Sequence, residues 1–270
     1  MTSKRVTVLA CAAFAALAGL PATSFAADMG YSIKDAPPPP SHRTWYLKGT
    51  IGMHNHDVGN TWNTGYAGGG FTVEHTDMKT APFFGLGIGV ERNRWLRLDL
   101  TGEYRGKFVF FSQDRYNNGG ACPGVGCGTN EFTADIESWL GLANAYIDIG
   151  TWRGITPYVG AGVGVASVSV LGLKDVNVPQ NSIFYGADNT EVNFAWALYA
   201  GMSYDVTSQF TVDLAYRYVD LGDAASGVVA AYDGSSSYPE HELQDITSHD
   251  VMLNLRYRLE HPVAYAGPVK

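Results

Sequence analysis

Alternation of apolar and polar side chains with period two is the feature that most constrains this fold. In the segment RWLRLDLTGEYRG, residues 94–106, Leu96, Leu98 and Leu100 share one parity and charged residues take the other. Successive side chains of a β-strand point to opposite faces, so such a strand separates an apolar face from a charged one. From Trp45 onward we find no convincing amphipathic helix and no internal repeat, which predicts an all-β chain.

Eight segments carry the alternation, and the connections between them alternate in length. The segments are residues 45–53, 82–92, 95–107, 133–149, 156–170, 193–205, 210–220 and 248–259. Short links fall at 93–94, 150–155 and 206–209, and long ones near 54–81, 112–132, 171–192 and 221–247. Most segments reach the roughly 9–11 residues that a tilted strand needs to cross a bilayer. The sequence therefore predicts an eight-stranded antiparallel up-and-down transmembrane β-barrel with short periplasmic turns and four long extracellular loops.

A soluble barrel would show the same alternation, but it would bury the apolar face. Aromatic residues favour the membrane barrel because most of them fall near strand ends, where interfacial girdles lie. They are Trp45, Tyr46, Trp95, Tyr104, Trp152, Tyr158, Phe194, Trp196, Tyr204, Phe210, Tyr218 and Tyr257. One segment is irregular, because the parity of Glu137 conflicts with that of Asn144 and Asp148. Either a bulge or a lipid-facing polar residue is required there.

The two ends predict export and a spacer. Lys4 and Arg5 precede an apolar stretch that ends in ATSFA, which predicts a signal peptide over residues 1–26. Residues 27–44 contain four consecutive prolines and predict an extended periplasmic linker, followed by the barrel at 45–259 and a periplasmic tail at 260–270. The mature chain is acidic, which argues against a nucleic-acid partner. We predict the outer membrane of a Gram-negative bacterium as its location.

The mature chain keeps two cysteines, Cys122 and Cys127, in the segment GGACPGVGCG. In an exported protein, two cysteines this close predict a local disulfide. Closing so short a ring stabilises a protein by only about 2 kcal/mol. A metal site is the alternative, but neither histidine nor a further cysteine stands nearby in the sequence.

Ser248, His249 and Asp250 stand in a row and have the residue types of a catalytic triad. Neighbours on a strand point to opposite faces, so His249 faces away from the other two. A triad is recognised by its geometry across the fold, not by adjacency in sequence. We predict no catalytic residues, no enzyme activity and no cofactor.

His54 and His56 share a parity in the segment MHNHD and are weak candidates for a metal site. A third ligand could come from Asp57 or from a loop. Two histidines at the entrance of a loop are more often solvated, and solvation is what we expect here.

The parity opposite the apolar one carries equal numbers of cationic and anionic residues. They are Lys48, Arg97, Arg105, Arg217, Arg256 and Arg258, and Glu91, Asp99, Glu103, Asp148, Asp213 and Asp250. The interior of an eight-stranded barrel is just wide enough to be filled by side chains. An unpaired ion there would cost several kcal/mol, so the set predicts a salt-bridged plug and no open pore. We expect the inward glycines of segments 82–92 and 156–170 to make room for the arginines.

Four segments carry a resemblance to a known family: LANAYIDIG, ITPYVGAGVGVA, FTVDLAYRYVDLG and SHDVMLNLRYRL. Over residues 45–259 the chain resembles the opacity-type, surface-antigen family of small outer-membrane barrels, in particular its alphaproteobacterial immunogenic, porin-like branch. The resemblance implies an eight-stranded barrel like the OmpA transmembrane domain, surrounded by outer-membrane lipid and lipopolysaccharide. It also implies roles in envelope integrity and host contact. One departure is that the last strand closes at Leu259, where such barrels usually end on an aromatic residue.

The predicted mature start, Ala27–Asp28, carries a second resemblance. Some related barrels are joined to peptidoglycan through an N-terminal Ala-Asp, and the linker has a suitable reach of about 45 Å for roughly 15 residues. Alternatively, Ala-Asp simply follows a common cleavage site. Three functions remain open: a structural envelope protein with a possible peptidoglycan partner, a small channel, and an adhesin whose loops bind a host or matrix ligand.

Overall fold

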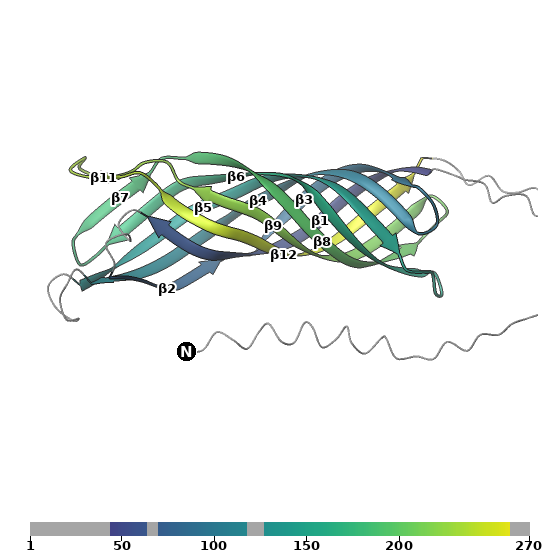
Figure 1. The fold of residues 1–270 in the computed structure, drawn as a ribbon, viewed down its shortest axis with the longest axis horizontal. Helices are drawn as coiled ribbons and strands as arrows, with labels where there is room; N and C mark the ends of the chain where they lie inside the picture. The colour runs from purple at the N-terminus through teal and green to yellow at the C-terminus, as the bar shows by residue number, and fades with distance from the viewer. Residues whose placement is uncertain (1–43, 64–69, 118–126, 260–270) are drawn as a thin grey trace, which may run out of the picture. The chain divides into compact units, whose positions relative to one another are not determined.

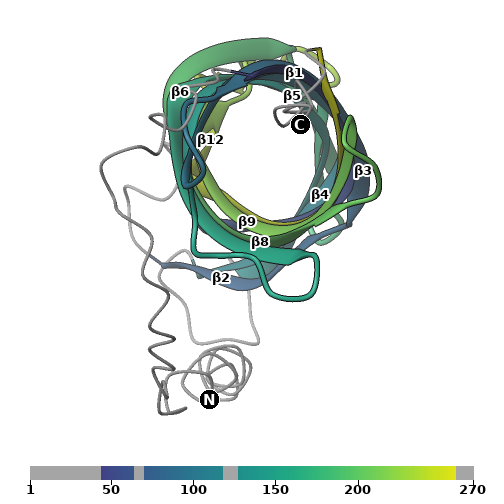
Figure 2. The ribbon, with the colours of Figure 1, turned by 90° about the vertical axis from the view of Figure 1, so that its right-hand side faces the viewer.

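Eight long antiparallel strands pair in a closed ring and form the wall of a barrel (Figure 1). The computed structural model describes residues 44–63, 70–117 and 127–259. The ring strands are β1 (Thr44–Asn63), β3 (Ala81–Glu91), β4 (Leu96–Asn117), β5 (Cys127–Asp148), β6 (Ile155–Asn177), β8 (Asn189–Asp205), β9 (Phe210–Ala225) and β12 (His241–Arg258). β1 pairs with β12, and β8 pairs with both β6 and β9, so the ring closes (Figure 2). The predicted eight-stranded antiparallel barrel is confirmed.

The two ends of the barrel differ in their connections. At the turn end, tight links join β3 to β4, β5 to β6 and β8 to β9. Leu259 N donates to Trp45 O there at 2.8 Å, so the described chain enters and leaves the barrel at this end. At the loop end lie four short strands: β2 (Phe71–Met78), β7 (Ser182–Gly186), β10 (Val229–Ala231) and β11 (Ser237–Tyr238). β2 pairs with β4 and β7 pairs with β6, so these strands extend the wall beyond the ring.

An apolar belt surrounds the half of the barrel nearer the turn end. Outward side chains in the belt are exposed and mostly aliphatic or aromatic, with tryptophans at both rims. The belt covers residues 45–53, 84–90, 96–104, 139–147, 155–165, 194–204, 210–218 and 249–257. Strands of about nine residues suit the roughly 25 Å apolar band of an outer-membrane barrel. Among the described residues, no helix has the length and apolar character to cross a bilayer.

Two of the predicted girdle residues lie inside the barrel instead. Tyr46 is fully buried and donates a hydrogen bond to Asp99 Oδ2 at 3.1 Å. Tyr158 is also buried, and the guanidinium of Arg97 lies 4.6 Å from the centre of its ring. Both prove to have the inward parity of their strands, so nearness to a strand end was a misleading guide for them.

The predicted strand ends were too short at the loop end. β1 continues to Asn63 instead of stopping at residue 53, and β12 begins at His241 instead of 248. Toward the loop end the alternation is reversed: Phe132 and Ile136 are buried inside β5, whereas Glu131 and Asp135 are exposed. Water replaces lipid outside this part of the wall, so the apolar side chains turn inward, as in a soluble barrel.

β-Bulges mark the change from one pattern to the other. On β4 the register shifts between Arg105 and Phe108, which both face inward although their parities differ. Positive φ angles at Gly172, Gly222 and Asp245 accompany the same change on β6, β9 and β12. A bulge inserts one unpaired residue and therefore shifts the facing of everything beyond it.

The irregular segment around Glu137 is explained by the outward orientation of this side chain. The parity of β5 runs unbroken from Glu137 to Asp148, and Glu137 faces outward at the rim of the belt. There its Oε2 accepts a hydrogen bond from Tyr104 Oη at 2.9 Å. The outward polar residue, and not a bulge on β5, is therefore the correct alternative.

Candidate functional site

The lumen of the belt and of its turn-end rim holds all twelve charged residues predicted to face it, and the structure brings every one into an ion pair. The pairs are Lys48–Asp99 (3.2 Å), Arg97–Asp148 (2.8 Å), Arg105–Asp250 (2.8 Å), Arg217–Glu103 (2.6 Å), Arg217–Asp250 (2.7 Å), Arg256–Asp213 (2.9 Å), Arg256–Glu91 (3.1 Å) and Arg258–Glu91 (3.0 Å). The parity rule therefore located the charges, whereas their pairing comes from the ring of strands.

The central cluster joins strands β4, β9 and β12. Arg217 donates from Nη1 and Nη2 to the two carboxylate oxygens of Glu103, at 2.8 and 2.6 Å, and from Nε to Asp250 at 2.8 Å. Arg105 donates to both oxygens of Asp250 and to Ser248 Oγ, at 2.8–2.9 Å. Two cations face two anions, so the cluster is neutral. Bidentate pairs of this kind are strong and geometrically specific.

A second cluster closes the lumen near the turn end. Arg256 donates to both oxygens of Asp213, at 2.9 and 3.0 Å, and to Glu91 at 3.1 Å. Arg258 donates to Glu91 and also to Asp205, at 3.0 and 3.1 Å. Asp205 was missed by the sequence reading because it is the last residue of β8, next to a tight turn.

Tyrosine and asparagine side chains complete the lumen and were also missed. Asp99 accepts hydrogen bonds from Tyr46, Lys48 and Asn144, at 3.1, 3.2 and 2.7 Å. Tyr199 donates to Asn144 Oδ1 at 2.8 Å. Inward parity was the available signal, since these residues share it with the charged set.

Gly89 and Gly162 make room for these neutral side chains. No arginine atom is among those nearest to a Cβ placed on the described inward glycines of β3 and β6, so the prediction that they accommodate arginines was wrong. A Cβ atom at Gly89 would overlap the ring of Tyr46, and one at Gly162 would overlap the amide of Asn144. A flat tyrosine ring lies across the neighbouring strand, where only hydrogen fits. The arginines instead reach toward the centre of the barrel, where the carboxylates lie.

Water has no access to the centre of the lumen. Phe83, Arg105, Arg217 and Asp250 each have 0% exposure although they face the interior of the ring. The open ring of ribbon in Figure 2 is therefore filled by side chains. The lining of a water-filled pore would contact solvent, and these groups do not.

His54 and His56 lie just beyond the central cluster and are buried, so the expectation that they are solvated was wrong. Their ring centroids are 4.5 Å apart, and His56 stacks on Phe108 at 4.2 Å. Asp57 faces outward and does not join them. Within the described ranges, no group of three or more His, Cys, Asp or Glu residues is placed to hold a metal ion.

Ser248, His249 and Asp250 do not converge. Ser248 and Asp250 are buried and bound to Arg105, whereas His249 lies on the outer face with Nδ1 against Tyr216 Oη. The three side chains therefore take part in two separate structures on opposite sides of the wall.

Several predicted features lie outside the described residues. They are the signal peptide, the linker up to residue 43 with Ala27 and Asp28, Cys122, and the tail at 260–270. Cys127 is described and is disulfide-bonded.

The comparison with protein families agrees with this architecture. The model of the outer membrane protein beta-barrel domain matches residues 6–258. An uncharacterised protein of Brucella suis biovar 1 is 31% identical over 252 residues, covering 82% of this chain and 86% of its own. Among solved structures, OprG from Pseudomonas aeruginosa has 12% sequence identity and a TM-score of 0.48. Neisserial surface protein A has 17% sequence identity and a TM-score of 0.40. Each of these two matches covers 80% of this chain and 97% of the other chain. The chain therefore belongs to the outer membrane protein beta-barrel domain family and is a barrel of the Gram-negative outer membrane.

Proposed function

We propose that this protein is a structural, non-enzymatic component of the outer membrane whose barrel is closed by its own side chains. The observation that supports this proposal is the central cluster, in which Arg105, Arg217 and Asp250 are paired and have no contact with solvent. A barrel filled in this way acts through its rigid wall and through what it presents at its two ends. Outer-membrane lipid and lipopolysaccharide form its surroundings.

A small channel is the rival function, and conductance separates the two. We expect the full-length mature protein, reconstituted in planar bilayers, to give no stable open level, because ions would have to displace the paired side chains of the lumen. A large-bore porin reconstituted in parallel controls for insertion and detection. Steady openings that scale linearly with voltage would overturn the closed-barrel proposal.

Attachment to peptidoglycan is a second part of the proposal. The linker would leave the barrel at the turn end, where Trp45 and Leu259 meet, and the turn end of such barrels faces the periplasm. We expect mass spectrometry of digested sacculi to find a muropeptide linked to a peptide that begins at Ala27. The same preparation from a strain lacking the gene is the control. A wild-type digest with no such peptide contradicts the attachment.

The finer assignments rest on the sequence resemblance. We infer that the protein belongs to the opacity-type, surface-antigen branch of small barrels, on the four motifs that carry the resemblance. A host or matrix ligand bound through the loops and the absence of a nucleic-acid partner stay predictions.

A further inference from the structure

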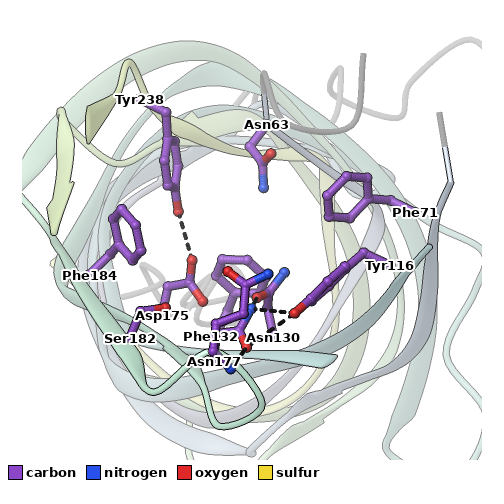
Figure 3. Close-up of a pocket in the computed structure, with 11 residues that line it drawn as sticks. Asn63, Phe71, Tyr116, Asn130, Phe132, Asp175, Asn177, Ser182, Phe184 and Tyr238 are labelled. Atoms are coloured by element: carbon purple, nitrogen blue, oxygen red, sulfur yellow. Dashed lines mark hydrogen bonds between the residues drawn. The ribbon is translucent and has the colours of Figure 1, made fainter. Parts of the chain in front are cut away.

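A cavity of about 350 Å³ opens inside the loop end of the barrel, beyond the apolar belt (Figure 3). Its walls come from β1, β2, β4, β5, β6, β7 and β11, so it depends on the assembled ring. Five aromatic rings line it, together with amides, a serine and one carboxylate. A volume of this size suits a small molecule.

The amides of the cavity are largely occupied by one another. Asn177 Nδ2 donates to Asn130 Oδ1 at 2.8 Å and to Tyr116 Oη at 3.0 Å. Asn177 Oδ1 accepts from the backbone N–H of Gln180, and Asn130 Nδ2 donates to Asp114 at 2.9 Å. A ligand recognised through many hydroxyl groups would have to break these bonds, which disfavours a sugar.

The carboxylate of Asp175, in contrast, has one oxygen without a hydrogen-bond donor among the described residues. Asp175 is 6% exposed, and its Oδ2 accepts a hydrogen bond from Tyr238 Oη at 3.2 Å. Among the described residues, no donor reaches the buried Oδ1. A buried carboxylate oxygen without a donor is costly, so the cavity lacks a hydrogen-bond donor or a positive charge at this point.

Aromatic side chains line the cavity together with Asp175, and the described lining contains no lysine or arginine. Phe184 pairs across the strands with Asp175, and its ring centroid lies 6.0 Å from that of Tyr238. On the opposite side of the cavity, the rings of Phe71 and Tyr116 form a second pair, with their centroids 5.9 Å apart (Figure 3). Aromatic faces attract cations through the ring quadrupole, and a carboxylate attracts an N–H cation more strongly still.

We propose that this cavity binds a small organic ammonium ion. An N–H of the ligand donates to the carboxylate of Asp175, and its carbon skeleton packs against the rings of Phe184 and Tyr238. The ligand supplies the donor and the positive charge that the described lining lacks.

The charge state of Asp175 makes this binding depend on pH. Burial, and to a lesser extent the nearby carboxylate of Asp114, raises the pKa of Asp175 to about 7. Burial also raises the pKa of Tyr238. His241 stacks on Phe132, which pairs across the strands with Asp175, and burial lowers the pKa of His241 to about 4. None of these groups is a cation at neutral pH. Because only the ionised carboxylate attracts an ammonium ion, affinity should rise with pH through about 7.

The test is calorimetric titration of the full-length mature protein in detergent with phenethylammonium, which stays charged between pH 6 and 8. We expect the affinity to fall about tenfold from pH 8 to pH 6, following ionisation of Asp175. At pH 8, Asp175→Asn should weaken binding at least tenfold. The matched control is Glu131→Gln, which removes the same charge from the exposed face of β5 at the same end of the barrel.

A neutral probe and a second variant keep the proposal falsifiable. 2-Phenylethanol, of similar shape without the charge, should bind at least tenfold more weakly than phenethylammonium. Phe184→Leu should weaken binding of phenethylammonium without removing the pH dependence of that binding. Equal affinity for the two probes, unchanged binding by Asp175→Asn, or preferential binding of methyl glucoside would overturn the assignment. If Asp175→Asn does not fold, the wild-type pH profile and Phe184→Leu decide.

Discussion

Replacing Arg217 with alanine is expected to destabilise the barrel by about 3–5 kcal/mol, because the change leaves one excess negative charge in a dry lumen. Arg217 is fully buried, and it is the described cation that pairs with Glu103. Asp250 would keep Arg105, but Glu103 would lose both of its charge-assisted hydrogen bonds. The measurement is urea unfolding of the protein in lipid vesicles, followed by tryptophan fluorescence.

The matched control for this prediction is Arg115→Ala at the loop end. Arg115 pairs with Glu74 at 3.3 Å, but the two side chains are 59% and 39% exposed. An exposed pair of this kind contributes less than about 1 kcal/mol. Equal effects of the two alanine variants would show that the central cluster does not hold the barrel together.

A double variant separates the loss of charge balance from the loss of packing. In Arg217→Ala with Glu103→Gln, the remaining cluster of Arg105 and Asp250 is neutral again. We expect the double variant to be more stable than Arg217→Ala alone, because an amide is far cheaper to bury unpaired than a carboxylate. A double variant less stable than the single one would show that packing of the arginine stem dominates.

The belt of this barrel could be predicted from the sequence because a strand has only two faces. Once Leu96, Leu98 and Leu100 are assigned to lipid, Arg97 and Asp99 must face the lumen. The same rule on the other strands located all twelve lumen charges. It could not supply the pairing, because Arg217 meets Glu103 only when eight strands close with one particular register.

The loop end could not be predicted in the same way, since the parity rule fails at a bulge. Predicted strands end at 107, 170 and 220, within two residues of the irregularities at Gly106–Lys107, Gly172 and Gly222. Beyond these irregularities the apolar side chains turn inward. A rule that assumes constant parity along a strand therefore assigns the continuing strand to a loop. Asp175 lies in such a stretch, and its neighbours Phe132 and Tyr238 come from distant parts of the chain.

Asp175→Asn is expected to stabilise the protein at pH 8 by about 4 kcal/mol, although it removes a proposed binding group. Burial raises the pKa of Asp175 in the folded protein to about 7 from an ordinary value of 3.8. Between these values the folded state keeps a proton that the unfolded state releases, so wild-type stability falls as pH rises, by about 1.4 kcal/mol per unit. Asparagine does not titrate, so the variant does not lose this stability.

The pH profile of the difference between variant and wild type is the decisive measurement. The advantage of Asp175→Asn should be small at pH 4, grow between pH 4 and 7, and remain constant above about pH 8. Burial lowers the pKa of His241 to about 4, so this residue makes the folded protein less stable as pH falls. The effect is the same in the variant and in the wild type, so it cancels in the difference between them. Glu131→Gln, on the exposed face of β5, should give a flat difference. A flat profile for Asp175→Asn as well would show that the carboxylate of Asp175 is ordinarily solvated. The cavity would then have no unsatisfied carboxylate oxygen, and the argument for an ammonium ligand would fail.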